Sequence, residues 1–114
     1  MSTTHQRFNQ YRNLWLMVFF DLPTETKVEI KAATRFRKAL IKDGFQMFQF
    51  SVYIRFCASK EMADVHTERT KRNLPEKGKI SILTVTDHQF GKMELFLGCL
   101  PDKPKERPKQ LQLF

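Results

Sequence analysis

Hydrophobic residues run without a polar break from Leu14 to Phe20, and Asp21 follows them directly. A short uninterrupted apolar run is typical of a strand that is covered on both faces of a sheet. The run is much shorter than the about 20 apolar residues that a membrane-spanning helix needs. The pattern therefore predicts a buried first strand, over about 14–21, that carries a carboxylate at the rim of a sheet.

The next segment, 26–43, has the period and the end signals of an amphipathic helix. Thr26 and Glu29 have the spacing of a capping box, and Gly44 stands where a left-handed C-terminal cap is expected. An apolar stripe for the core is predicted at Val28, Ala32, Phe36, Ala39 and Leu40. A separate cationic stripe is predicted at Lys27, Lys31, Arg35, Lys38 and Lys42.

The segment 45–56 is rich in aromatic and β-branched residues and predicts two short strands with a tight turn near Phe50 and Ser51. A single bent strand fits the same residues and stays open as an alternative. Ser59 is expected to begin a second helix, over about 60–73, with His66 at its surface or boundary.

The C-terminal third alternates short apolar runs with turn signals. A fourth strand is predicted over about 80–85, then one helical turn that Thr86 and Gln89 cap, then a fifth strand over 93–97. The order of elements predicts an α+β, ferredoxin-like βαββαβ fold with an additional C-terminal strand.

Such a fold carries both helices on one face of its sheet and leaves the other face bare. A bare apolar face must be covered, and a homodimer is the simplest solution. The fifth strand could then pair with the sheet edge of the neighbouring subunit.

We expect a polar leader over 1–13, the folded domain over 14–100 and a basic, proline-rich tail over 101–114. The tail has too little apolar surface to fold alone. Its last residues, Leu111 to Phe114, include apolar positions that could dock on a partner.

The chain is strongly basic, with 20 Lys and Arg against 12 Asp and Glu, and a formal charge of +8 over its 114 residues. That excess favours an anionic partner, most simply nucleic acid, although a basic protein without a specific ligand has the same composition. The two cysteines, Cys57 and Cys99, lack metal-type spacing, and no signal peptide is visible. A reduced, cytoplasmic setting is therefore expected.

Asp21 is the candidate for metal chemistry. Mg²⁺ (or Mn²⁺) takes one or two carboxylates together with water and phosphate oxygens, so a two-fold dimer that supplied Asp21 twice would suit it. The competing interpretation is an Asx-type turn before Pro23. The histidines His5, His66 and His88 are scattered, and no catalytic triad or glycine-rich phosphate loop is visible.

The cationic stripe is the candidate nucleic-acid surface, against the alternative of an ordinary solvated helix face. Two copies in a dimer would form a long positive track. Because basic residues displace counterions from backbone phosphates, we expect affinity that falls steeply with salt and shows little sequence preference.

Five segments, in this order and spacing, resemble the CRISPR-associated protein two (Cas-two) family in the version found in type II systems. They are residues 18–24 (VFFDLPT), 36–45 (FRKALIKDGF), 49–53 (QFSVY), 72–75 (RNLP) and 83–90 (LTVTDHQF). The resemblance covers 14–98. It implies a ferredoxin-like homodimer with metal near Asp21, and it implies that Ser51 and Arg55 line the same cleft.

The resemblance also implies a role in spacer acquisition, in which the dimer bridges CRISPR integrase subunits and holds double-stranded DNA. Family members include metal-dependent endonucleases on RNA or DNA, single-stranded RNA among them, and others that act as scaffolds. We therefore expect a Mg²⁺-dependent endonuclease with Asp21 as the catalytic metal ligand. The alternatives are a non-catalytic DNA scaffold, a ferredoxin-like RNA-binding module and a toxin-type ribonuclease.

Overall fold

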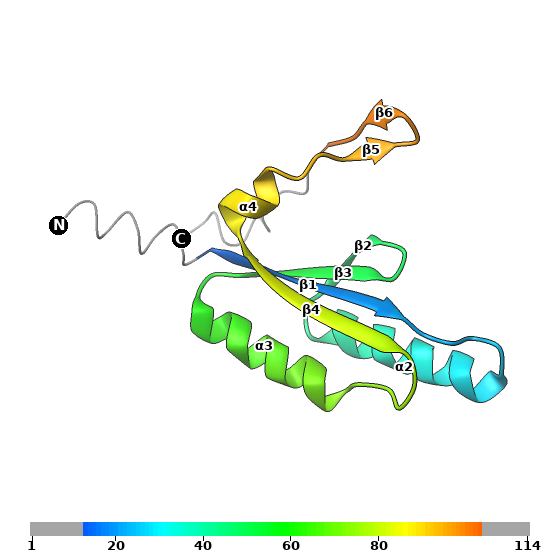
Figure 1. Cartoon of the computed structure of the whole chain (residues 1–114). Coiled ribbons are helices and arrows are strands. Elements are labelled where there is room, and N and C mark those ends of the chain that lie inside the picture. The colour runs from blue at the N-terminus through cyan, green and yellow to red at the C-terminus, as the bar shows by residue number, and fades with distance from the viewer. Residues whose placement is uncertain (1–12, 104–114) are drawn as a thin grey trace.

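The computed structural model describes residues 13–103, so the leader before Asn13 and the tail segment from Leu111 to Phe114 lie outside the described residues. Four antiparallel strands form the main sheet in the order β2-β3-β1-β4. Helices α2 and α3 lie on one face of it (Figure 1). The predicted α+β, ferredoxin-like fold is confirmed. The elements are β1 (Leu14–Asp21), α2 (Lys27–Lys42), β2 (Gln46–Gln49), β3 (Val52–Cys57), α3 (Lys60–Arg72), β4 (Lys79–Thr86), α4 (Asp87–Gly91), β5 (Phe96–Leu97) and β6 (Leu100–Pro101).

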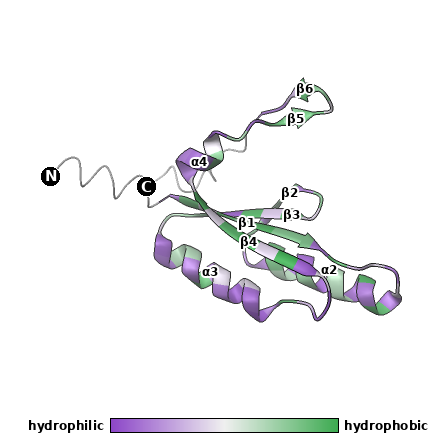
Figure 2. Ribbon diagram, in the orientation of Figure 1, coloured by the Kyte–Doolittle hydropathy of each residue, from purple (hydrophilic) through white to green (hydrophobic). Residues whose placement is uncertain are grey.

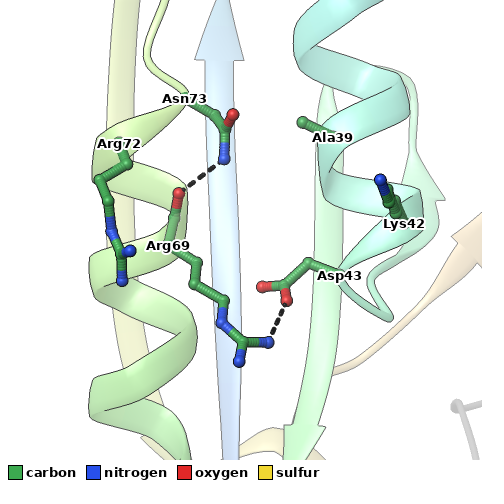
Figure 3. Close-up of a pocket in the computed structure, with 6 residues that line it drawn as sticks. All are labelled: Ala39, Lys42, Asp43, Arg69, Arg72 and Asn73. Carbon is green, nitrogen blue, oxygen red and sulfur yellow. Dashed lines mark hydrogen bonds and ion pairs between the residues drawn. The ribbon is translucent and has the colours of Figure 1, made fainter.

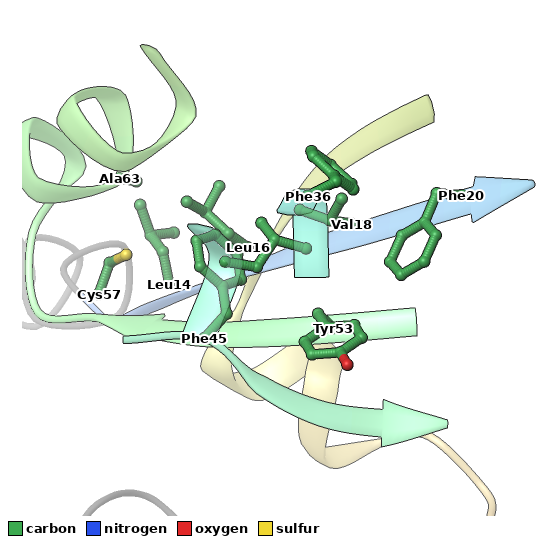
Figure 4. Close-up of a cluster of buried hydrophobic side chains, with 10 residues drawn as sticks. Leu14, Leu16, Val18, Phe20, Phe36, Phe45, Tyr53, Cys57 and Ala63 are labelled. Carbon is green, nitrogen blue, oxygen red and sulfur yellow. The ribbon is translucent and has the colours of Figure 1, made fainter. Parts of the chain in front are cut away.

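β1 lies in the middle of the sheet, paired on both sides, which explains its unbroken apolar sequence. Its alternate side chains face α2 and α3 and form the larger core (Figure 4). Figure 2 shows the hydrophobic colour along β1 and much of the hydrophilic colour on α3. The buried members of this core are Leu14, Leu16, Val18, Phe20, Phe36, Leu40, Phe45, Tyr53, Cys57 and Ala63.

Helix α2 begins at the predicted capping box. The Thr26 hydroxyl accepts from the Glu29 backbone N–H, and the Glu29 carboxylate accepts from the Thr26 N–H, both at 3.1 Å. Gly44 follows the helix at φ 92°, the left-handed conformation that ends it. The predicted apolar stripe is wrong at Val28, which is 78% exposed, because the helix begins beyond the edge of the core.

The two-strand interpretation of 45–56 is confirmed. β2 and β3 are joined by a turn at Phe50 and Ser51, and Ser51 takes φ 65° there. The single bent strand is excluded, because β2 and β3 pair with each other antiparallel.

The second face of the sheet was expected to be bare, but the structure shows that it is partly covered. Trp15 stacks on Phe90 of α4 with ring centroids 4.3 Å apart, and its indole N–H donates to Asp87 Oδ1 at 2.7 Å. The short helix α4 thus buries one end of this face. Toward the other end of β1, Phe19 is 36% exposed and the neighbouring Leu83 is 48% exposed.

The predicted fifth strand over 93–97 is corrected to a separate hairpin. β5 pairs with β6 rather than with the main sheet, through a two-residue loop in which Gly98 takes φ 64°. Pro101, the first residue of the predicted tail, pairs with Phe96 in this hairpin. The hairpin extends away from the main sheet (Figure 1).

An ionic cluster ties α2 to α3. Asp43, the C-terminal cap of α2, contacts His66 Nδ1 at 2.8 Å. It also pairs with Arg69 at 3.0 Å (Figure 3). His66 is only 6% exposed, so the expected surface or boundary position is wrong. A carboxylate at the negative end of a helix dipole needs such compensation.

Candidate functional site

Asp21 ends β1 on the face of the sheet opposite to α2 and α3. Phe20 packs into the core below α2, and successive strand side chains point to opposite faces, so Asp21 points away from the helices. Asp21 is exposed, and its carboxylate makes no hydrogen bond or ion pair with any residue that the structure describes. The Asx-type turn before Pro23 does not form, and the carboxylate is available to an external ligand.

The backbone around Asp21 is held on both sides. The Phe20 N–H donates to the Ser51 carbonyl at 3.0 Å, and Asp21 lies opposite Lys79 of β4. The loop before β4 passes so close that a Cβ on Gly78 would lie 2.7 Å from the Asp21 carbonyl oxygen. Gly78 also takes φ 100°, so only glycine suits this position. The rim that presents Asp21 is therefore a rigid one.

The structure brings Ser51 to this rim but not Arg55. Ser51 lies in the β2–β3 turn beside Phe20. Arg55 pairs with Leu16, about 16 Å from Asp21 along the strand, and it lies on the helix-covered face. Its guanidinium donates to the Asp43 carbonyl at 2.8 Å and to the Phe56 carbonyl at 2.8 Å. In one protomer, Arg55 therefore stabilises the end of α2 and does not line a cleft with Asp21.

Asp21 is the one acidic residue of β1. Among residues 13–103, no three His, Cys, Asp or Glu side chains lie close enough to hold a metal ion together. His88, the exposed histidine of α4, follows the opposite end of β4 and lies far from Asp21. A divalent ion at Asp21 would need a second copy, water or a phosphate oxygen to complete its ligands.

The cationic stripe is exposed along the whole of α2. Its members lie within about 80° of one another around the helix, at roughly 100° per residue. The buried Ala33, Phe36 and Leu40 lie on the opposite side of the helix. The stripe therefore points away from the sheet, while Asp21 points out of the other face. Its members are Lys27, Lys31, Arg35, Lys38 and Lys42, all exposed.

The two cysteines differ in burial. Cys57 is buried in the core, and burial raises the pKa of its thiol. Cys99 is exposed in the hairpin loop. Neither cysteine lies at the rim with Asp21, which leaves that rim without a thiolate ligand within the described part of the chain.

A family model for CRISPR associated protein Cas2 matches residues 14–93, from the start of β1 to just beyond α4. The chain belongs to the CRISPR-associated protein Cas2 family. The matched segment includes Asp21, Ser51, the whole of α2 and the whole main sheet.

Three relatives support the same assignment, and each is named CRISPR-associated endoribonuclease Cas2. One from Flavobacterium psychrophilum is 59% identical over 110 residues, which is 96% of both chains. One from Parvibaculum lavamentivorans is 46% identical over 101 residues, 89% of this chain and 100% of the relative. One from Paracidovorax avenae is 45% identical over 104 residues, 91% of this chain and 96% of the relative.

A helix with the length and hydrophobicity of a membrane span is not present among the described residues.

The exposed positions of Asp21 and of the cationic stripe could be predicted from the sequence, because both depend on local patterns. The cluster of Asp43, His66 and Arg69 was missed, because its members come from two helices with no signal that pairs them.

Proposed function

We propose that two copies of this Cas2 protein form a metal-dependent endonuclease that cleaves RNA or DNA, with Asp21 of each copy at the cleavage site. The exposed, unpartnered carboxylate of Asp21 on a rigid rim carries this proposal. The relatives' name, endoribonuclease, supports a nuclease and favours RNA as substrate.

Dimerisation would occur through the sheet face that α4 leaves open. Phe19 and Leu83 are half-exposed there, and Asp21 projects from the same face. Contact through this face would bury both apolar side chains and bring the two Asp21 side chains toward each other. A second carboxylate for the ion would then come from Asp21 of the partner.

In this arrangement the pair of Asp21 carboxylates would hold Mg²⁺ (or Mn²⁺) beside a backbone phosphate. When bound, such an ion lowers the pKa of a coordinated water and neutralises charge on the phosphate. Asp21 itself contributes negative charge at a fixed position, because the Gly78 and Ser51 contacts hold its backbone. Lys79, paired with Asp21 across the sheet, adds a cation near the same rim.

The test compares Asp21→Asn with Asp64→Asn, an exposed carboxylate on α3. Cleavage of single-stranded RNA and double-stranded DNA is followed with and without Mg²⁺. We expect Asp21→Asn to lose metal-stimulated cleavage by about 100-fold or more, since it removes a ligand charge, and Asp64→Asn to retain it. Undiminished cleavage by Asp21→Asn would refute the site.

A second function is favoured by one specific observation, the opposite orientation of Asp21 and the cationic stripe. DNA bound along α2 would lie on the far side of the sheet from Asp21 of the same chain. We therefore propose that the protein also serves as a scaffold for spacer acquisition, holding double-stranded DNA and bridging CRISPR integrase subunits. Purification with a candidate integrase tests the scaffold function. If the Asp21→Asn variant still supports spacer uptake, cleavage is not required for spacer acquisition.

A ferredoxin-like RNA-binding module is less favoured, because such modules stack bases on exposed aromatics of the open sheet face. Here Trp15 and Phe56 on that face are buried at 0% and 5% exposure, whereas Phe19, toward the other end of β1, is 36% exposed. Phe90 of α4 stacks on Trp15 and occupies the position that a base would need.

A further inference from the structure

A cavity lies between the last turns of α2 and α3 in the described part of the chain. It has a volume of about 350 Å³. The small side chain of Ala39 leaves room on the α2 side, opposite Asn73 at the end of α3 (Figure 3). The cavity is on the helix side of the sheet and is separate from the Asp21 rim. Its lining residues are Ala39, Lys42, Asp43, Arg69, Arg72 and Asn73.

The lining carries three cations and one carboxylate, and that carboxylate is already neutralised. Asp43 Oδ2 contacts His66 Nδ1 at 2.8 Å, and its Oδ1 accepts from Arg69 at 3.0 Å. Lys42 and Arg72 make no ion pair with any described residue. Two cationic side chains, one from each helix, therefore flank the cavity with their charges uncompensated.

Cations at helix C-termini are expected, because they complement the negative end of the helix dipole. That effect accounts for a basic residue on each helix, but not for a cavity between them. Asn73 adds a polar group at the cavity wall, held by its own hydrogen bond to the Arg69 carbonyl at 2.8 Å. The fork of an arginine and the point charge of a lysine together suit a phosphate group.

The cavity is continuous with the cationic stripe. Lys42 is both the last member of the stripe and part of the cavity wall. From Lys27 to Lys42 the helix rises about 22 Å at 1.5 Å per residue. That length equals roughly six to seven base pairs at 3.4 Å each. A duplex along the stripe would reach the cavity with its sugar-phosphate backbone.

We propose that this cavity binds one backbone phosphate of nucleic acid lying along α2, between Lys42 and Arg72. The proposal rests on the proposed scaffold function and adds a defined anchoring point to it. The remaining members of the stripe lie on an open helix surface, whereas this phosphate would sit between two helices. It fixes where the duplex backbone leaves α2 and crosses toward α3.

The test compares Arg72→Gln with Lys71→Gln, its neighbour on α3, which lies outside the cavity and pairs with Glu68 at 3.6 Å. Affinity for a duplex DNA of about 30 base pairs is measured across a salt series. Removing one phosphate contact should reduce the slope of log affinity against log salt by about 0.9. We expect this reduction in Arg72→Gln and no change in Lys71→Gln.

Inorganic phosphate is titrated as a second probe, at low salt, with backbone amide shifts followed by NMR. We expect saturable shifts at Asn73 and Lys42 that Arg72→Gln abolishes and Lys71→Gln retains. Equal behaviour of the two variants in both assays, with duplex still bound, would overturn the cavity and leave the proposed function standing. A wild-type chain that binds no duplex at any salt would instead overturn the scaffold function and the proposal with it, and phosphate shifts alone would then indicate a site for free phosphate.

Discussion

The ring of Phe20 packs edge-on against the ring of Phe36, with centroids 5.3 Å apart, and this contact lies between the cationic stripe and Asp21, which point to opposite sides of the molecule. Phe36 lies on the buried side of α2, so the cationic stripe points outward. Asp21, the residue after Phe20, must then leave the sheet from the other face. Nucleic-acid binding along α2 and cleavage at Asp21 should therefore be separable by mutation.

Neutralising the middle of the stripe should weaken duplex binding without changing metal-stimulated cleavage of a short single-stranded substrate. The combined variant Lys31→Gln, Arg35→Gln and Lys38→Gln removes three exposed charges from one helix face. Each phosphate contact contributes about 0.9 to the slope of log affinity against log salt. We therefore expect this slope to become less steep by up to about 2.7 in the triple variant. Fluorescence anisotropy over a salt series measures it.

The matched control for this prediction neutralises three other lysines, each of which is ion-paired. Lys60 pairs with Asp64, Lys71 with Glu68, and Lys77 lies 3.9 Å from Glu29. Their combined change to Gln alters the net charge by the same amount. If the slope of log affinity against log salt falls by the same amount in both triple variants, duplex binding depends on net charge alone. The stripe is then not a defined binding surface.

Phe36 should be a principal support of the fold. It is 1% exposed between α2 and the sheet, and Phe36→Ala would remove its packing against Phe20. We expect a loss of about 3–5 kcal/mol in the free energy of unfolding, measured by urea denaturation. Phe50→Ala, at a position 82% exposed, should cost less than about 1 kcal/mol. Similar losses for the two variants would contradict the core described above.

The two thiols should react at very different rates in the native protein. Burial raises the pKa of the Cys57 thiol and also shields it, whereas Cys99 is exposed. Since the thiolate is the reactive form, a disulfide reagent at pH 8 should modify Cys99 quickly and Cys57 only on unfolding. Mass spectrometry after brief labelling distinguishes the two sites. Rapid labelling of Cys57 would mean that the core opens.

The capping box predicts a pH dependence of stability. Hydrogen bonding to the Thr26 backbone lowers the pKa of Glu29 below its ordinary value of 4.5. A carboxyl with a lowered pKa stabilises the folded chain above about pH 4.5, and this contribution is lost as the pH falls through the folded pKa. Glu29→Gln should therefore be less stable than wild type at pH 7. The difference should shrink at pH 3, and thermal unfolding at both values checks it.

Local patterns in the sequence predicted most of the fold. Both capping boxes, the β2–β3 turn and the left-handed Gly44 depend on residues close in the chain, and each has a specific spacing. The pairing of Trp15 with Phe90, across 75 positions, leaves no such pattern, so the cover that α4 gives to the second sheet face was missed.

The candidate site shows the same difference between local and long-range patterns. The exposed positions of Asp21 and of the stripe could be predicted, because strand alternation and helix period place them without tertiary information. Arg55 was grouped with Asp21 by resemblance, yet period-2 alternation puts its side chain on the other face, with Leu16. The cavity beside Lys42 needed the packing of α2 against α3, which no periodicity encodes.

The binding of Mn²⁺, measured by isothermal titration calorimetry on protein of known oligomeric mass, tests the shared Asp21 site most directly. Our account predicts a dimer that binds one ion for every two chains, and an Asp21→Asn dimer that binds none. A monomer, or one ion per chain that persists in Asp21→Asn, would contradict it.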